Sequence, residues 1–247
     1  MFTFKSLSVS YAAVSKVGSR ERNEDSVLEL EQDGQYCFVV ADGLGGHSFG
    51  DKASRLLTET FAHEFKNASD NRKFLAHAFE RAQEEILVMQ STMCAKDQMK
   101  TTAVALSISG KKCAWGHVGD SRLYLFYRGV LVTRTLDHSV PQMLAMAGEI
   151  TDSDIANHPD RARLLRAVGD KWEKPQYEIA KEIMLRRDTA FLLCTDGVWE
   201  WLSDSLLAPQ QGADAGSWLS EVINKLEHTV GEMANIDNYS AITVIVG

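Results

Sequence analysis

Hydrophobic and polar positions follow two different periods along this chain. Short apolar runs rich in Val, Ile and Phe, bounded by turn residues, predict β-strands. The predicted strands lie at about 8–17, 26–31, 35–41, 101–109, 112–118, 121–127, 130–135, 176–182, 189–195 and 240–246. Between 101 and 135 the runs are separated by short turns that contain Gly, a spacing that predicts an antiparallel meander.

Longer segments repeat their apolar residues at i, i+3, i+4 and i+7, which is the period of an amphipathic helix. This period predicts helices at 49–66 and 72–93, with further helices at about 140–147 and 214–231. Hairpins in the middle of the chain and helices in two places predict an α+β architecture, an antiparallel sheet sandwich covered by helices. Residues 148–170 show no clean period and predict a flap-like excursion.

No linker, repeat or low-complexity stretch divides the sequence, so we expect a single domain over 1–247. The composition, 45% hydrophobic and 24% charged, is that of an ordinary globular protein. The net charge of −8 argues against a nucleic-acid partner, which requires a basic face. No run approaches the roughly 20 apolar residues of a membrane span, and the first residues lack the pattern of a signal peptide.

The four cysteines have no spacing typical of a zinc site. Three of them lie inside apolar runs, where a free cysteine behaves as a small hydrophobic residue. We therefore expect all of them to be reduced core residues, as suits a cytoplasmic protein. They are Cys37, Cys94, Cys113 and Cys194.

Three aspartates stand at the ends of apolar runs. Asp42 follows residues 36–41 and precedes a Gly-rich turn, and Asp196 closes the run before Gly197. Asp237 lies just before the last apolar run. Carboxylates that converge from strand ends repel one another unless a cation or a proton lies between them. Oxygen ligands alone suit Mg²⁺ or Mn²⁺, so the pattern predicts a metal enzyme.

These aspartates belong to a set of motifs in a definite order. The motifs are 18–26, an acidic turn that contains Arg20, then 42–47, 119–124, 194–198 and 237–240. In this order they resemble the metal-dependent serine/threonine protein phosphatases of type 2C, in their compact bacterial form. The resemblance extends over nearly the whole chain, from residue 20 to residue 246. Each motif alone is weak, because Asp-Gly is more often a turn or a helix cap than a ligand.

The resemblance implies an αββα four-layer sandwich, two antiparallel sheets flanked by helix pairs, with two Mn²⁺ or Mg²⁺ ions between the sheets. Carried over by position, it implies that Asp42 bridges both ions. It further implies that the backbone carbonyl of Gly43 binds one ion and that Asp196 and Asp237 hold the other.

The resemblance also assigns the remaining site residues. It implies that Glu24 and Asp25 act mainly through metal-bound waters, and that Asp120 helps to recruit a third ion. Arg20 would clamp the phosphate of the substrate, since its guanidinium forms a planar fork that matches two phosphate oxygens. We thus expect Arg20 and Asp42 to be catalytic, with Arg20 binding the substrate.

Chemistry and resemblance lead to the same expected reaction. Two divalent ions about 3.5–4 Å apart lower the pKa of a shared water and stabilise the attacking and leaving oxygens. The resulting hydroxide can attack phosphorus in line without a protein nucleophile. We expect hydrolysis of phosphoserine and phosphothreonine in proteins, opposing a bacterial Ser/Thr kinase. In size and pattern the chain is similar to the subgroup that regulates type VI secretion.

The general acid of this reaction has no assigned residue. Eukaryotic relatives carry a His directly after the Asp-Gly pair, whereas this chain has Leu44 there. A metal-bound water is the first candidate. We expect His47 to support the Gly-rich turn, and we expect His138 to be structural, because its motif matches a structural motif of the family.

Two alternatives compete with an active phosphatase that opposes a kinase, namely a binding module and a related branch of the family. A binding module that senses phosphoproteins would keep the fold, but degenerate members usually lose a metal aspartate, and none is missing here. The branch that controls anti-sigma-factor partners tends to lack the phosphate-clamping Arg, which is present as Arg20. A Cys-based phosphatase is excluded because neither Cys37 nor Cys194 has an Arg six residues later. A nucleotide-binding P-loop is absent as well.

Three arginines, Arg161, Arg163 and Arg166, lie in the predicted flap. They either approach an anionic substrate or form a solvated basic turn, and the sequence leaves both readings open.

Overall fold

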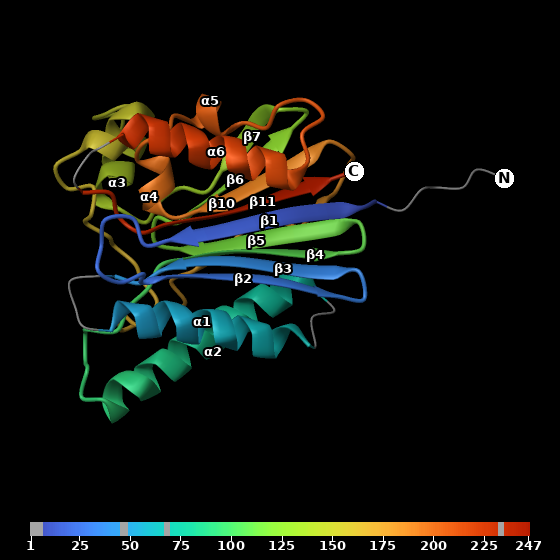
Figure 1. Ribbon diagram of the computed structural model, residues 1–247. Coiled ribbons are helices and arrows are strands. Elements are labelled where there is room, and N and C mark those ends of the chain that lie inside the picture. The colour runs from blue at the N-terminus through green and yellow to red at the C-terminus, as the bar shows by residue number, and fades with distance from the viewer. Residues whose placement is uncertain (1–6, 45–48, 67–69, 232–234) are drawn as a thin grey trace.

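The computed structural model describes residues 7–44, 49–66, 70–231 and 235–247. Over these ranges the chain forms two antiparallel sheets, with helices on their outer faces (Figure 1). One sheet has the strand order β1-β11-β10-β6-β7, and the other has the order β2-β3-β4-β5-β8, with β9 also paired to β5. The predicted α+β fold, the αββα sandwich, is confirmed.

The strands are β1 (Val9–Lys16), β2 (Asp25–Gln32), β3 (Gln35–Asp42), β4 (Ala103–Ser109), β5 (Lys112–Val118), β6 (Arg122–Tyr127), β7 (Val130–Arg134), β8 (Glu178–Ile179), β9 (Ile183–Met184), β10 (Thr189–Cys194) and β11 (Tyr239–Val246). The helices are α1 (Gly50–Phe65), α2 (Asn71–Thr92), α3 (Val140–Ala147), the 3-10 helix η1 (Asp152–Asn157), α4 (Asp196–Trp199), α5 (Asp204–Leu207) and α6 (Ala215–Val230). Most bounds lie within a residue or two of the predicted ones.

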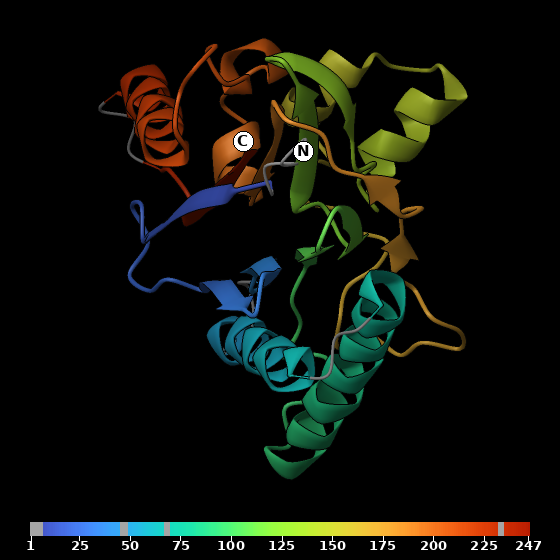
Figure 2. The ribbon, with the colours of Figure 1, turned by 90° about the vertical axis from the view of Figure 1, so that its right-hand side faces the viewer.

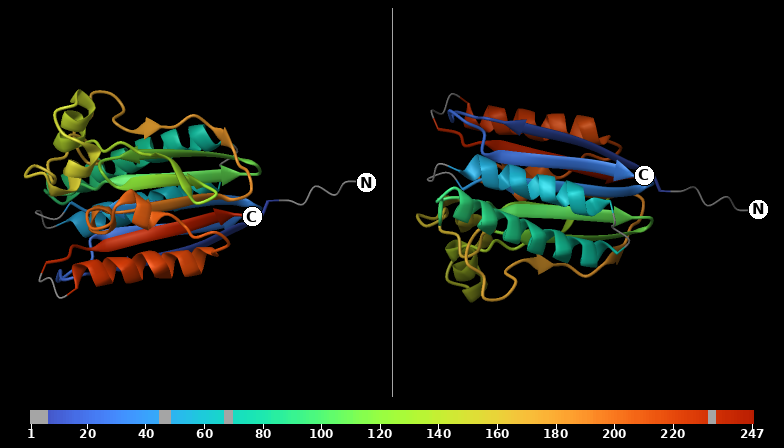
Figure 3. Two further views of the ribbon diagram at one scale, coloured as in Figure 1. Left: turned by 90° about the horizontal axis from the view of Figure 1, so that it is seen from above. Right: turned by 90° about the horizontal axis from the view of Figure 1, so that it is seen from below.

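The layers are best seen from the end of the molecule. Helices α1 and α2 cover the outer face of the β2–β5 sheet, and α6 covers the outer face of the other sheet (Figure 2). In the view from above, α6 lies in front of the sheets, whereas in the view from below α1 and α2 lie in front of them (Figure 3). None of the helices in the described ranges is long and apolar enough to cross a membrane.

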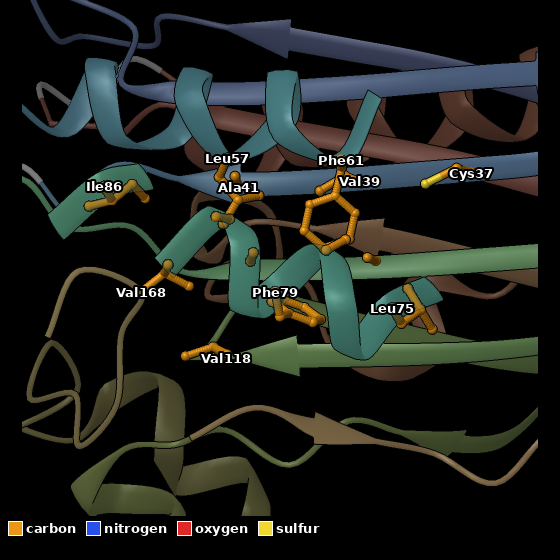
Figure 4. Packing of buried hydrophobic residues seen from close by; sticks show 14 of the residues in the cluster. Cys37, Val39, Ala41, Leu57, Phe61, Leu75, Phe79, Ile86, Val118 and Val168 are labelled. Atoms are coloured by element: carbon orange, nitrogen blue, oxygen red, sulfur yellow. The ribbon is translucent and has the colours of Figure 1, made fainter. Parts of the chain in front are cut away.

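Strand β3 shows why the predicted strands are continuous apolar runs. Phe38 and Val40 point into the core between the two sheets. The alternate residues Cys37, Val39 and Ala41 point the other way, into the core beneath α1 and α2 (Figure 4). Because successive side chains alternate between faces, a strand buried on both faces has apolar residues at every position.

The sequence also determines how the helices begin and pack. Asp70 caps α2 by accepting hydrogen bonds from the backbone N–H groups of Arg72 and Lys73, each at 3.1 Å. Phe61 of α1 lies edge to face against Phe79 of α2, with the ring centroids 5.0 Å apart. The cap stabilises the start of α2, and the ring contact joins α1 to α2 in the core that covers β3.

The predicted meander from 101 to 135 is wrong in one respect. Strands β4 and β5 pair in one sheet, whereas β6 and β7 pair in the other, so the chain crosses between the sheets after Val118. A short turn with Gly fits a hairpin and a crossing equally well, so the spacing could not separate them. Gly119 has φ +94, and the crossing places Asp120 between the two sheets.

Smaller differences concern two other predictions. Of the predicted strand 176–182, only Glu178–Ile179 forms a strand, β8, and a second short strand, β9, follows at Ile183–Met184. Both pair with β5. The expectation that all four cysteines are core residues is wrong for Cys94, which is free and exposed just after α2. Its backbone has φ 52, which a helix does not adopt, so Cys94 lies in the turn that follows α2.

The core between α1 and α2 supplies a test of the packing. Replacing the fully buried Phe61 by Ala is expected to lower the free energy of unfolding by about 3–5 kcal/mol, because the cavity cannot collapse between two sheet-bound helices. Urea unfolding followed by circular dichroism measures this change. Val88→Ala on the exposed face of α2 is the control and should stay within about 0.5 kcal/mol of wild type. A loss below about 1 kcal/mol for Phe61→Ala would contradict the packing.

Candidate active site

Five aspartates come together at one end of the sandwich, and we call them the acidic centre. Asp25 begins β2 and pairs in register with Asp42, which ends β3. Asp196 follows β10 and begins α4, and Asp237 lies just before β11. Asp120 comes from the crossing between β5 and β6. The topology thus brings together every aspartate that the sequence predicted as a ligand.

The surroundings of the acidic centre disfavour the charged form of its carboxyl groups. Burial, and after it the nearby charge of Asp196, raises the pKa of Asp42 well above its usual range. Burial also raises the pKa of Asp25 to about 7, with Asp196 contributing, and that of Asp196 to about 6, with Asp237 contributing. The pKa of Asp120 is raised by burial and then by Asp196. Converging carboxylates of this kind call for a cation or protons between them.

Protein cations do not meet this need. Within the described ranges, the only ion pair that involves the acidic centre joins Arg20 to Asp237. The Arg20 Nε donates to Asp237 Oδ1 at 2.9 Å, and a second guanidinium nitrogen donates to Oδ2 at 2.7 Å. Both side chains are about half exposed, so the pair lies at the rim. The predicted phosphate clamp therefore contacts a predicted metal ligand.

Asp25 gives a direct sign of a missing partner. Thr195 Oγ1 donates to Asp25 Oδ2 at 3.1 Å, but Asp25 Oδ1 is buried and has no hydrogen-bond partner in the described part of the chain. Buried carboxylate oxygens are normally satisfied. An oxygen-only donor set with an orphaned oxygen fits a hard divalent cation.

Gly43 brings the backbone close to this centre. Its N–H donates to the carbonyl of Glu24 at 3.1 Å, and a Cβ at this position would lie 2.3 Å from the carbonyl oxygen of Gly50. Only glycine therefore fits where β3 meets α1. The pKa of Glu24 is raised by burial and then by Asp51 and Asp237.

The site opens into a cleft of about 860 Å³. The predicted site residues that line it are Arg20, Glu24, Asp42, Gly43, Asp120, Asp196 and Asp237. Asp25 is not among the lining residues. Leu44 is one of them, and its side chain has no titratable group. The Gly-rich turn continues into residues 45–48, so His47 lies outside the described residues.

Of the flap arginines, Arg163 lines the cleft. Arg161 donates through Nε to Glu200 at 3.0 Å, and Arg166 donates to Glu178 at 2.9 Å. The predicted approach to the cleft is therefore seen for one arginine of the three.

Several residues of the site carried no assigned role from sequence. Lys100 lines the cleft and pairs with Asp170 at 2.7 Å, and no sequence signal distinguishes this lysine from a surface one. Asn238 lay inside a motif, and its amide ties the 17–24 loop to β11. Its Oδ1 accepts from Glu24 N–H at 2.8 Å, while Nδ2 donates to the carbonyls of Val17 and Arg22.

The fold and the carboxylate centre define a class of protein that can hold hard divalent cations at one end of a two-sheet sandwich. The chain belongs to the protein phosphatase 2C family, which matches residues 14–235. This family membership confirms the resemblance on which the predicted enzyme class rested.

Individual relatives agree with this membership. The serine/threonine phosphatase stp of Listeria monocytogenes serotype 4b is 30% identical over 226 residues, which is 88% of this chain and 83% of that protein. The catalytic domain of the serine/threonine protein phosphatase PstP, solved in complex with two manganese ions, superposes with a TM-score of 0.81 at 27% identity, covering 97% of this chain and 99% of that one. PppA, a key regulatory component of T6SS in Pseudomonas aeruginosa, superposes with a TM-score of 0.76 at 29% identity, covering 98% and 100%.

The raised pKa values predict how stability depends on pH. Asp196 and Asp25 titrate near 6 and 7 in the folded protein, against a reference value of 3.8 for the unfolded chain. The folded state therefore holds extra protons, and its stability falls as pH rises from about 4 through 7. In excess chelator the melting temperature should drop between pH 5 and pH 8.

The variant Asp25→Asn isolates this effect. It should melt with a smaller drop over the same pH range, whereas Asp33→Asn in the exposed β2–β3 turn should behave as wild type. An equally steep fall in Asp25→Asn would show that Asp25 does not carry the effect.

Proposed function

We propose that this chain is a metal-dependent phosphatase that hydrolyses phosphoserine and phosphothreonine in proteins. The observation that carries the proposal is the acidic centre of a member of the protein phosphatase 2C family, in which Arg20 makes the only ion pair found among the described residues. The relative from Listeria is named a serine/threonine phosphatase, which supports the same substrate class.

The proposal includes two Mn²⁺ or Mg²⁺ ions, with a third at Asp120. Asp42 and the Gly43 carbonyl would contact them directly, as would Asp196 and Asp237. When bound, the ions would activate a water for in-line attack on phosphorus and neutralise charge on the phosphate. The two manganese ions bound by the PstP catalytic domain support this cofactor.

Glu24 and Asp25 have indirect roles in the proposal, acting through water. Glu24 lines the cleft, and its pKa is raised by burial and then by neighbouring acids, whose repulsion a cation would relieve. Thr195 keeps Asp25 turned toward the centre by donating to Oδ2 and leaving Oδ1 free to accept.

Arg20 would bind the phosphate of the substrate. Its guanidinium lines the cleft in a bidentate pair with Asp237, so it would exchange the two carboxylate oxygens for two phosphate oxygens. Lys100 and Arg163 line the same cleft and would add positive charge along it. Leu44 has no ionisable group, so no general acid comes from that position.

The proposal also includes the compartment of the enzyme and the system in which it acts. A single catalytic domain over 1–247 in the cytoplasm would oppose a Ser/Thr kinase. The free cysteines support a reducing compartment. The likeness to PppA, a regulatory component of T6SS, supports a role in that kind of secretion system.

The first test is hydrolysis of a phosphothreonine peptide with Mn²⁺ and with excess chelator. Activity should require the metal. Asp196→Asn and Asp42→Asn should lower kcat/KM by more than about 100-fold, because each would remove a negative charge and replace one carboxylate oxygen by an amide nitrogen. Asp188→Asn, an exposed aspartate outside the cleft, should keep wild-type activity. Undiminished turnover in chelator would overturn the proposal.

A second test separates binding from chemistry. Arg20→Ala should raise KM about 10–100-fold and change kcat less, since a charged hydrogen-bonded contact contributes about 1.5–3 kcal/mol. Arg20→Lys should be intermediate, because the charge stays and the fork is lost. Steady-state kinetics on the same peptide measure both, with Arg128→Ala in the exposed β6–β7 turn as the control. An unchanged KM in Arg20→Ala would rule out the phosphate clamp.

A further inference from the structure

His138 holds both backbone polar groups of Gly119, the residue before Asp120. The His138 N–H donates to the Gly119 carbonyl at 2.9 Å, and the Gly119 N–H donates to His138 Nδ1 at 3.1 Å. No larger residue fits at the position of Gly119, since a Cβ there would lie 2.6 Å from Thr102 Cβ. The backbone that leads into Asp120 is thus fixed by one buried imidazole residue.

The hydrogen bond at Nδ1 determines where the imidazole carries its proton. Because Nδ1 accepts from an amide N–H, the neutral ring must carry its hydrogen on Nε2. That nitrogen lies 3.2 Å from Glu178 Oε1, to which it can donate. Burial, with the neighbouring His117 and Arg166, lowers the pKa of His138 to about 4, which is consistent with a neutral ring.

This tautomer argues against a metal site in the same place. His117, His138 and Glu178 offer ligand atoms that lie within 4.8 Å of one another. A protonated Nε2 cannot bind a metal ion. Moreover, a guanidinium nitrogen of Arg166 lies 3.1 Å from that Nε2 and 2.9 Å from Glu178 Oε1. The cluster is better described as a hydrogen-bonded connection.

The other end of this connection is the flap, residues 148–170. Leu165 N–H donates to the His138 carbonyl at 2.8 Å, and Leu164 forms a bridge with Ser139. Arg166 reaches the His138 ring through Glu178. Leu164 and the adjacent Arg163 line the catalytic cleft. The flap therefore contacts His138 through its backbone and its side chain, next to the residues that face a substrate.

Asp120 is held from its far side as well. Its carbonyl accepts from Trp199 Nε1 at 3.0 Å, and the neighbouring Ser121 Oγ lies 2.7 Å from Thr102 Oγ1. Trp199 belongs to α4, which begins with Asp196. With one side of the turn fixed by the helix, the hydrogen bonds of His138 set the other side.

We propose that His138 is a positioning residue that couples the flap to Asp120 and so tunes the metal site that Asp120 serves. The inference rests on the proposed function, in which Asp120 recruits a third ion. A movement of Leu165 or Arg166 on substrate binding would be passed through His138 to the Gly119 N–H and from there to Asp120. Mutation of residues that orient a metal ligand without binding the metal commonly lowers metal affinity 10–100-fold.

Two variants separate the contact that His138 makes through Nδ1 from the contact that it makes through Nε2. In Asn the side-chain oxygen occupies nearly the place of Nδ1, so His138→Asn can still accept from Gly119 N–H. In Gln the polar end reaches the place of Nε2, so His138→Gln keeps a donor for Glu178 and loses the Gly119 contact. Mn²⁺ binding is titrated by calorimetry, and kcat and KM for a phosphothreonine peptide are followed against Mn²⁺ concentration.

We expect His138→Gln to weaken one Mn²⁺ site about tenfold and to shift the Mn²⁺ dependence of kcat, with little change in KM. His138→Asn keeps the Gly119 contact and loses the Glu178 contact, so it should weaken the same site by a clearly smaller factor. His158→Asn and His158→Gln, changes to a flap histidine whose ring contacts Asp160, should match wild type. Equal losses in both His138 variants, or no loss in either, would overturn the proposal.

Two further measurements keep the outcomes distinct. Should the His138 variants fail to fold, Glu178→Gln and Arg166→Ala test the coupling from the flap side. They should weaken the same Mn²⁺ site, and unchanged Mn²⁺ binding in both would overturn the proposal. If wild type binds Mn²⁺ but hydrolyses no phosphopeptide, the proposed function fails, while the comparison of Mn²⁺ affinities still decides the role of His138.

Discussion

The crowding of carboxylates away from water is the constraint on which the rest of this structure depends. In four of the five aspartates the pKa is raised, with burial as the largest cause and neighbouring carboxylates adding to it. The fold keeps them together by ending its strands at one place. A stacked pair of sheets does this without long loops, since strand ends from both sheets meet at the same edge.

Close backbone approaches fix that edge. A Cβ on Gly197 would lie 2.1 Å from the Asn238 carbonyl oxygen, so α4 begins directly against the segment that carries Asp237. Gly43 has the same role between β3 and α1. The apolar cores on both sides of each sheet supply the stability that a destabilising site requires, and proteins commonly place such local strain at functional sites.

Much of this could be predicted from sequence because it depends on local pattern. Strand β3 is apolar at every position from Cys37 to Ala41 since both its faces are buried, and α1 and α2 show a helical period because one face is. The motifs placed the aspartates at strand ends, where they are found. The crossing at Gly119 was missed because the choice between a hairpin and a crossing is made by the partner strand β10, far away in sequence. The pairs Lys100–Asp170 and Arg20–Asp237 were missed for the same reason.

The neighbours Asp137 and His138 show how one short segment serves both fold and site. Asp137 accepts two hydrogen bonds from the buried guanidinium of Arg122, which also lies over the ring of Trp199 at 3.5 Å. A buried ion pair is not in itself strongly stabilising, because desolvation offsets much of its attraction. Its value here is geometric, since it orients Trp199, whose indole N–H holds the Asp120 carbonyl. With His138 on the Gly119 side, consecutive residues of one turn hold both sides of the Asp120 backbone, and that turn is itself hydrogen-bonded to the flap.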